Sequence, residues 1–216
     1  MHFPEKFARR LAMSVFGVFF CSMAIGMFRH SGFGVDPFQC FAMGIWEKFF
    51  PQLSYGLFWS AISLLFMGFD LWYDRRTMGL ATLINLLLAG YIVDASETVM
   101  KLLFPAPALS MRIALLCVGL VICCFGASLY MTADFGVSVY DALAVSISKK
   151  HSFPFRLCRI ATDLVCVGIG ALCGLMPGIG TIVTALCMGP LVDFFNRTVS
   201  TPMLRFTHKR SRVKMA

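Results

Sequence analysis

The segment that decides the fold is Leu11–Phe28, which reads LAMSVFGVFFCSMAIGMF and contains no charged residue. About 17–25 mostly apolar residues are enough for a helix to cross the hydrocarbon core of a bilayer. The segment follows Lys6, Arg9 and Arg10, as a signal peptide would, but it lacks a convincing small-x-small cleavage site and more apolar segments follow it. We therefore expect an uncleaved membrane helix.

The rest of the chain has the composition of a membrane protein. Of its 216 residues, 58% are apolar and only 14% are charged, whereas a soluble domain has about 25% charged residues. This excludes a water-soluble enzyme and a disordered protein. We predict an all-α, polytopic fold with six transmembrane helices, and the five further spans are Tyr55–Trp72, Met78–Ala95, Ile113–Met131, Leu157–Leu175 and Gly178–Phe195.

The basic residues predict the orientation. The net charge is +8; if residues 1–10 are cytoplasmic, fifteen Lys and Arg residues fall on the cytoplasmic side and only Arg29, Lys48, Lys101 and Arg112 fall outside. Because cytoplasmic loops carry the excess of Lys and Arg, we expect both termini inside, with a basic cytoplasmic tail over 199–216 and an extracytoplasmic linker over 99–112. Topology explains the basic charge, so the lipid bilayer is the expected partner and nucleic acid is not.

An internal repeat divides the apolar region into two copies, 11–98 and 113–198. Three helices per copy is an odd number, so the second copy has to enter the membrane upside down, as in many secondary transporters. The alternative is a chance match between apolar helices. At an offset of 102, Gly17, Cys21, Phe33, Gly34 and Val35 match Gly119, Cys123, Phe135, Gly136 and Val137; at an offset of 99, Gly79, Thr82, Gly90 and Asp94 match Gly178, Thr181, Gly189 and Asp193.

A helix-capping signal follows the first span of each copy. Asp36 and Ser138 are good N-cap residues, and Pro37 suits the first helical position. Gln39 and Asp141 lie three residues after the cap, where a side chain can reach back to the cap N–H as in a capping box.

Each cap predicts a short amphipathic helix, over 37–48 and 139–149, that is too short to span a bilayer. One interpretation is a helix lying on the membrane surface. The other is a helix that dips into the membrane with its N-terminal end aimed at a central site, where Asp36 and Asp141 would favour a cation or an amine over an anion.

The third helix of each copy carries Gly-x-x-Thr, then Gly eleven and Asp fifteen residues after the first Gly. At 100° per residue these positions share an arc of about 120°, and small residues let helices approach closely in lipid. We expect this stripe to form the helix crossing between the copies, with Pro190 kinking the last span. Asp94 and Asp193 lie near helix C-termini, where the dipole disfavours a negative charge, so each needs a basic partner. The stripe residues are Gly79, Thr82 and Gly90 in the first copy and Gly178, Thr181 and Gly189 in the second.

Arg159 and Asp163 lie one helical turn apart on the fifth span, and the first copy has no charged counterpart. A charge at the bilayer centre costs about 2.5–3.5 kcal/mol on insertion scales, and an intramembrane ionisable residue is by default a functional hypothesis. The alternative is a purely structural ion pair between the copies. We select Asp163, Arg159 and Asp141 as coupling or gating charges.

Other chemistry is not indicated. The nine Cys residues form no CxxC pair and lie mostly in apolar runs, which favours packing over a disulfide or a metal site. The four His residues are scattered, and no nucleotide-binding or hydrolase motif is present. We expect no cofactor, no metal and no enzymatic activity.

The capped loops, the Arg159 and Asp163 pair and the run from Gly178 to Asp193 resemble the bacterial YczE/YyaS/YitT family of integral membrane proteins. The likeness covers about residues 8–198. It implies six spans in the bacterial cytoplasmic membrane and a role in export, with no definite substrate. The family tends to have Pro followed by an acid in both loops, whereas this chain has Gln39 and Val139, so a symmetric proton-coupling scheme is not implied.

We therefore expect a small secondary transporter, most simply an exporter of an unidentified small molecule, that works by rocking two inverted copies against each other. The alternatives are a non-transporting scaffold or partner subunit of another membrane or biosynthetic system, and a channel-like facilitator. A homodimer fits the small number of helices, but no motif predicts it.

Overall fold

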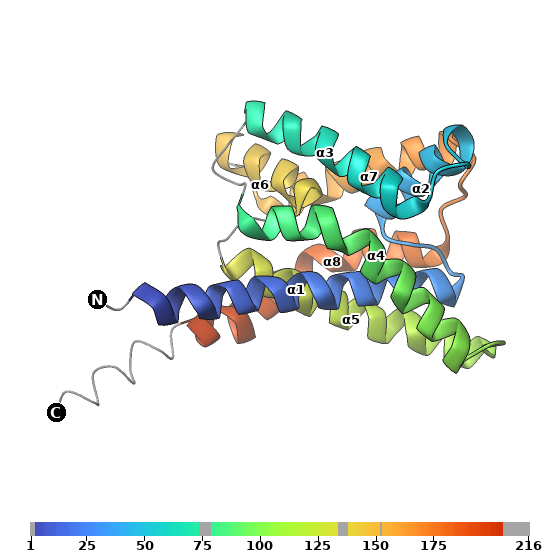
Figure 1. Cartoon of the computed structure of the whole chain (residues 1–216), viewed down its shortest axis with the longest axis horizontal. Coiled ribbons are helices and arrows are strands. Elements are labelled where there is room, and N and C mark those ends of the chain that lie inside the picture. Colours follow the sequence, from blue (N-terminus) through green and yellow to red (C-terminus); the bar gives the residue numbers. More distant parts are fainter. Residues whose placement is uncertain (1–2, 74–78, 134–137, 152, 205–216) are drawn as a thin grey trace.

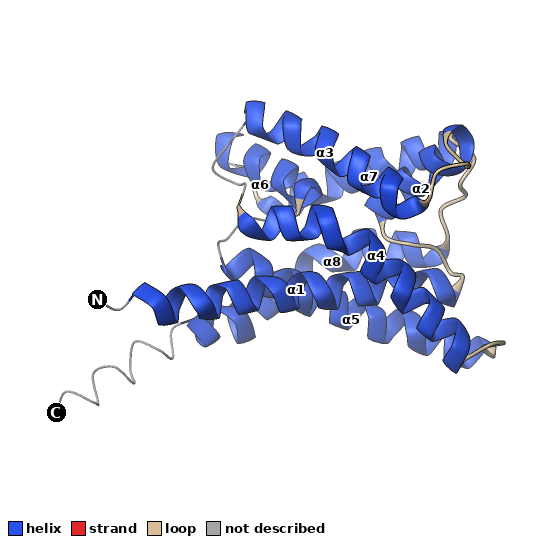
Figure 2. Ribbon diagram, in the orientation of Figure 1, coloured by secondary structure: helices blue, strands red, loops and turns tan. Residues whose placement is uncertain are grey.

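The computed structural model describes residues 3–73, 79–133, 138–151 and 153–204 (Figure 1). Within these ranges every regular element is a helix (Figure 2), as predicted. In Figure 1 the start of α1 and the end of α8 lie at the same end of the molecule. The elements are α1 (Phe3–Ser31), α2 (Pro37–Phe49), α3 (Tyr55–Tyr73), α4 (Leu80–Leu103), α5 (Leu109–Ala133), α6 (Val139–His151), α7 (Phe155–Leu172), α8 (Ile179–Phe195) and a π-helical turn, η2 (Asn196–Ser200).

Five helices of the described chain are long and apolar enough to cross a membrane: α1, α3, α4, α5 and α8. They coincide with five of the six predicted spans. The sixth, α7, falls outside this group because its 18 residues include Arg156, Arg159 and Asp163. Residues 74–78, 134–137 and 205–216 lie outside the described residues, and with them Phe135, Gly136 and Val137 of the repeat and most of the predicted basic tail.

The most extensive contact between two described helices is that of α1 and α5, which pack along much of their length. Gly17 and Gly126 meet there: a Cβ on Gly17 would lie 2.7 Å from the backbone oxygen of Gly126, and a Cβ on Gly126 would lie 2.8 Å from that of Gly17. Nearby, the Cys21 thiol donates to the Cys123 carbonyl at 3.3 Å. The absence of side chains at both glycines therefore permits the close approach.

Gly17→Ala tests this crossing. The added methyl group would also lie 2.9 Å from the Tyr130 backbone nitrogen, and helix backbone cannot move aside as a flexible side chain can. We expect a loss of about 1–3 kcal/mol in unfolding free energy, as for overpacked cores, read as a lower melting temperature in detergent. The matched control is Gly68→Ala on α3, where a Cβ meets nothing within 4 Å; equal losses in both variants would contradict the prediction.

The short helices α2 and α6 lie inside the bundle, toward opposite ends of the molecule in Figure 1. Their first turns are buried, and the rings of Phe38 and Tyr140 stack at 4.6 Å with an interplanar angle of 9°. Further along α2, a Cβ on Gly44 would lie 3.0 Å from the carbonyl oxygen of Gly170 on α7. The N-terminal turns of both short helices are therefore packed within the protein, and the small residue Gly44 lets α2 approach α7 closely.

The predicted crossing between α4 and α8 is also wrong, because these helices are not among the closely packed pairs. A Cβ on Gly90 would lie 3.2 Å from the ring of Trp59, on α3 of the same half. Gly79 caps α4, and its N–H donates to the Thr82 hydroxyl at 3.3 Å.

The start of α8 packs instead on the loop that follows α1. The Gly180 N–H donates to the Phe33 carbonyl at 2.8 Å, and a Cβ on Gly34 would lie 2.5 Å from the Thr181 hydroxyl oxygen. Gly34 has φ +107, which favours glycine at this turn. Gly178 contacts the Phe33 carbonyl, so the stripe on α8 joins the two halves through a loop rather than through α4.

Candidate functional site

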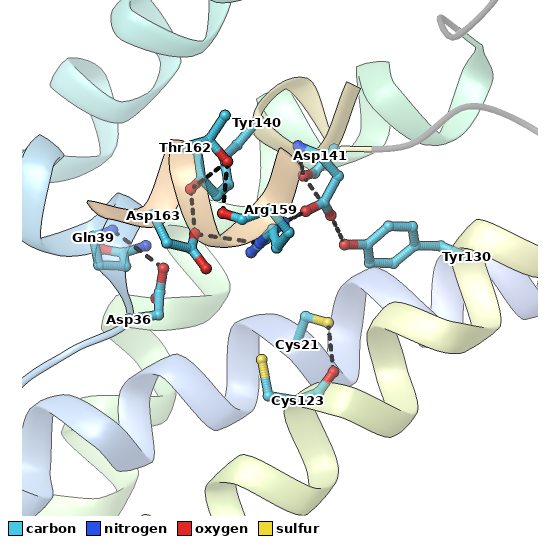
Figure 3. A network of polar contacts seen from close by, with 11 residues as sticks. Cys21, Asp36, Gln39, Cys123, Tyr130, Tyr140, Asp141, Arg159, Thr162 and Asp163 are labelled. Atoms are coloured by element: carbon cyan, nitrogen blue, oxygen red, sulfur yellow. Dashed lines mark hydrogen bonds and ion pairs between the residues drawn. The ribbon is translucent and has the colours of Figure 1, made fainter. Parts of the chain in front are cut away.

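A cluster of buried charged and polar groups lies between the first turns of α2 and α6 and the middle of α7 (Figure 3). Its charged members are three carboxyl groups, Asp36, Asp141 and Asp163, and one guanidinium, Arg159. Each is at most 7% exposed. We call these four residues the central cluster.

Arg159 holds the central cluster together. Its Nη1 forms an ion pair with Asp141, and its Nε lies 3.3 Å from Asp163 Oδ1. Its guanidinium also lies 4.5 Å from the centre of the Tyr140 ring. The structure therefore brings together Asp163, Arg159 and Asp141, the three residues that the sequence analysis grouped.

Two tyrosines complete this part of the cluster. The Tyr130 hydroxyl, from α5, donates to Asp141, and the Tyr140 hydroxyl donates to Asp163. The Ser138 hydroxyl donates to Asp141 Oδ2 at 2.9 Å. Asp141 thus has one cation and two hydroxyl donors, which is the pairing that a buried carboxylate requires.

Asp36 is much less well paired. As the N-cap of α2 it accepts the Gln39 N–H on Oδ1 at 3.2 Å, whereas Oδ2 has no hydrogen-bond partner among the described residues. Burial raises the pKa of Asp36 to about 6, against the lowering effect of the Gln39 N–H and of Arg159. The cap predicted at Asp36 is confirmed, and so is that at Ser138, which accepts the Asp141 N–H at 3.2 Å.

The capping-box prediction for Gln39 is wrong. Gln39 Oε1 accepts from Arg29 at 3.2 Å and from the Tyr55 hydroxyl instead of capping the helix. Arg29 also forms ion pairs with Asp94 at 3.0 Å and Glu97 at 3.4 Å. These contacts tie the end of α1 to α2, α3 and α4, because a buried guanidinium needs several acceptors.

Asp94 and Asp193 both have a basic partner, as predicted, but the predicted position of Asp94 near a helix C-terminus is wrong, because α4 continues to Leu103. Asp94 pairs with Arg29, and Asp193 pairs with Arg197 one turn later at 2.8 Å. The second pair is exposed, with 78% of the Arg197 side chain accessible. The two aspartates lie on different helices and are not part of the central cluster.

A small pocket opens beside the Asp141 and Arg159 pair, between α5, α6, α7 and α8. Gly189, next to Pro190 in α8, forms part of its wall, together with Ala127, Met131, Met188 and Val192. No group of three or more metal-ligating side chains gathers anywhere in the described part of the chain.

Sequence reasoning missed Arg29, Tyr55, Tyr130 and Tyr140 as members of the polar contacts. Tyr140 lies in the second capped loop, between Ser138 and Asp141, so the sequence could have indicated its place near the site. Arg29 was counted only as one of four outer positive charges. Tyr55 and Tyr130 fit the apolar pattern of their spans, and nothing in the sequence distinguishes a buried hydroxyl there.

Comparison with known proteins places the chain among uncharacterised membrane proteins. The family described as "Family of unknown function (DUF6198)" matches residues 8–197. An uncharacterized protein of Haemophilus influenzae is 24% identical over 188 residues, 87% of this chain and 83% of the relative. The uncharacterized membrane protein YczE of Bacillus subtilis is 26% identical over 164 residues, 74% of this chain and 73% of that protein. No solved structure gives a significant match.

These likenesses confirm the resemblance to YczE-like proteins. Together with the five long apolar helices, they identify an integral membrane protein. Large apolar side chains such as Leu65, Leu87 and Leu186 are more than half exposed on the described surface, where they contact lipid.

Proposed function

Because this chain belongs to the DUF6198 family, a family of unknown function, we propose its activity from its own buried site. We propose that the protein is a small secondary transporter that exports an unidentified small molecule. The central cluster carries the proposal. Ionisable residues within membrane segments are costly and generally serve ion or substrate pathways. Here four of them converge between the first turns of α2 and α6 and the helix α7.

The inverted repeat is supported by the pattern of helix packing. In the repeat, α1 corresponds to α5, α2 to α6, α3 to α7 and α4 to α8. Under this correspondence the contact of α1 with α4 becomes that of α5 with α8, and both contacts are present. The same correspondence relates α2 with α7 to α6 with α3, and α3 with α4 to α7 with α8. The contact of α1 with α5 maps onto itself, as it would around a pseudo-two-fold axis.

Two pairs of repeat-related residues meet where such an axis would pass. Cys21 and Cys123 are 102 positions apart and are joined by a hydrogen bond. Phe38 and Tyr140 are also 102 positions apart and stack face to face. Residues related by a two-fold axis contact each other only near that axis, so both pairs favour duplication with inversion over chance similarity.

In this scheme α7 is the sixth span, the counterpart of α3, and its Arg159 and Asp163 belong to the central cluster rather than facing lipid. Its buried residues Arg159 and Asp163 contrast with Leu164 and Val165, whose side chains are more than 60% exposed. The short helices α2 and α6 then begin at the centre and run outward toward opposite membrane faces. Discontinuous helices that point at a midplane site are a common plan in secondary transporters.

The test begins with a thermal-shift screen of the purified protein against metabolites and drugs. A ligand at 100 times its Kd stabilises the folded state by about 2.7 kcal/mol, so a true ligand raises the melting temperature. Each hit is then used in a counterflow assay, in which proteoliposomes preloaded with unlabelled compound take up labelled compound from outside. We expect transient accumulation above the external concentration.

The three expectations from the sequence give different results in this assay. A carrier gives counterflow. A channel-like facilitator gives flux down a gradient without transient accumulation, and a scaffold gives neither. Absence of counterflow for every compound that stabilises the protein would contradict the proposal.

A further inference from the structure

We infer that Asp36 binds and releases a proton in the central cluster, with Oδ2 as the protonated atom and the Asp163 carboxylate as its neighbour. The assignment of this proton as a coupling ion rests on the proposed transport function, whereas the protonation itself does not. The two carboxyl groups, one from the loop before α2 and one from α7 (Figure 3), interact electrostatically.

The argument starts from the number of charges. The central cluster contains three carboxyl groups and one guanidinium. Asp141 and Asp163 share Arg159, and each also accepts a tyrosine hydroxyl. Among the described residues Asp36 has neither an ion pair nor a hydroxyl donor, so in the ionised form its buried charge is offset only by the more distant Arg159, which is unfavourable.

Each of the two carboxyl groups has one buried oxygen without a donor in the described part of the chain. Asp36 Oδ2 and Asp163 Oδ2 both lack a hydrogen-bond partner among the described residues, and the residues are 7% and 0% exposed. Two adjacent carboxylates cannot both ionise easily, and a shared site of this kind retains one proton. Protonating Asp36 forms one O–H bond, removes one negative charge and supplies the missing donor.

Comparison of the two capped loops explains why Asp36 differs from Asp141. In the first loop the cap is Asp36 and the residue three positions later is Gln39. In the second loop the cap is Ser138 and the residue three positions later is Asp141. The two acids are therefore not related by the repeat and occupy different surroundings. Asp141 is paired with Arg159 and accepts hydrogen bonds from Tyr130 and Ser138. The hydrogen bond that Asp36 accepts comes from a backbone N–H, that of Gln39.

Several titratable or charged groups act on Asp36 from the neighbouring elements. Arg159 favours its ionised form and Asp163 opposes it, both from α7. The other titratable neighbours are three thiols and one phenol. They are Cys21 on α1, Cys40 on α2, Tyr55 on α3 and Cys166 on α7. Burial decides the balance and places the pKa of Asp36 at about 6, so the group is neutral below that pH and charged above it.

Infrared difference spectroscopy on the full-length protein in detergent tests this without any substrate. The C=O stretch of a protonated, buried carboxyl group is followed while the pH is raised from 4 to 8, and we expect a band that disappears with a midpoint near the pKa of about 6. Asp36→Asn should remove this band. Asp193→Asn, at an exposed ion pair, should leave it unchanged.

Asp163→Asn gives an independent reading if Asp36→Asn fails to fold. Removing the neighbouring negative charge favours ionisation of Asp36, so the midpoint should move to lower pH while the band remains. A band that persists in Asp36→Asn and vanishes in Asp163→Asn would assign the proton to Asp163 and overturn the inference. So would a midpoint that shifts when sodium replaces choline, since a metal cation would then occupy the site.

The infrared experiment tests the proton site and the counterflow experiment tests the transport function, so each proposal can be rejected without the other. Titration of Asp36 without counterflow would keep the proton site and reject the transporter. Counterflow without a titrating Asp36 would keep the transporter and reject the proton assignment.

Discussion

Arg159→Met is expected to lower the free energy of unfolding by about 3–5 kcal/mol, the range found when one partner of a buried ion pair is removed. Methionine fills much of the space of the arginine stem but carries no charge. Asp141 and Asp163 would then lose the cation with which both are paired. Melting temperature and recovery of the monodisperse protein in detergent measure the loss.

Two further variants show whether the loss comes from charge. Arg197→Met removes an exposed ion pair, in which the side chains are 78% and 57% accessible, and surface pairs contribute roughly 0–1 kcal/mol. The triple variant Arg159→Met, Asp141→Asn, Asp163→Asn removes the uncompensated charges and should recover much of the stability. A loss in Arg159→Met no larger than that in Arg197→Met would show that the central cluster is not held by this cation.

Asp163→Asn is expected to reduce transport to background while the protein still folds. Asparagine has nearly the same shape, and its side-chain oxygen can still accept the Tyr140 hydroxyl that Asp163 accepts. What it removes is the charge that Arg159 faces from within the same helix. Counterflow in proteoliposomes measures the loss, with the melting temperature as a check on folding.

The matched control for this variant is Asp193→Asn, which makes the same chemical change at a carboxylate that is 57% accessible. It should retain counterflow. Wild-type counterflow in Asp163→Asn would mean that the central cluster is structural, and the transport assignment would lose its main support.

Local chemistry made some of these residues predictable. The caps at Asp36 and Ser138 follow from residue type and spacing, and both accept the expected N–H. Arg159 and Asp163 were evident because charges are rare in apolar segments. The helix ends of α2 and α6 came out within about two residues for the same local reasons.

Tertiary partners were not predictable in the same way. A stripe such as Gly79, Thr82 and Gly90 indicates which residues share a face, but periodicity does not say which helix covers that face, and Trp59 does so at Gly90. Gln39 satisfied the spacing of a capping box, yet a guanidinium 10 positions away in sequence binds its oxygen. Both outcomes depend on how the helices assemble, which a single sequence does not encode locally.

The stacked rings of Phe38 and Tyr140 have a consequence for any solute that crosses this protein. They occupy the point where the first turns of α2 and α6 meet, so a continuous passage requires the rings to part. An aromatic contact of this kind contributes only about 0.5–1.5 kcal/mol beyond its buried area. Most of the cost of parting the rings therefore comes from exposing their buried apolar area, because Phe38 and Tyr140 are each only 4% exposed.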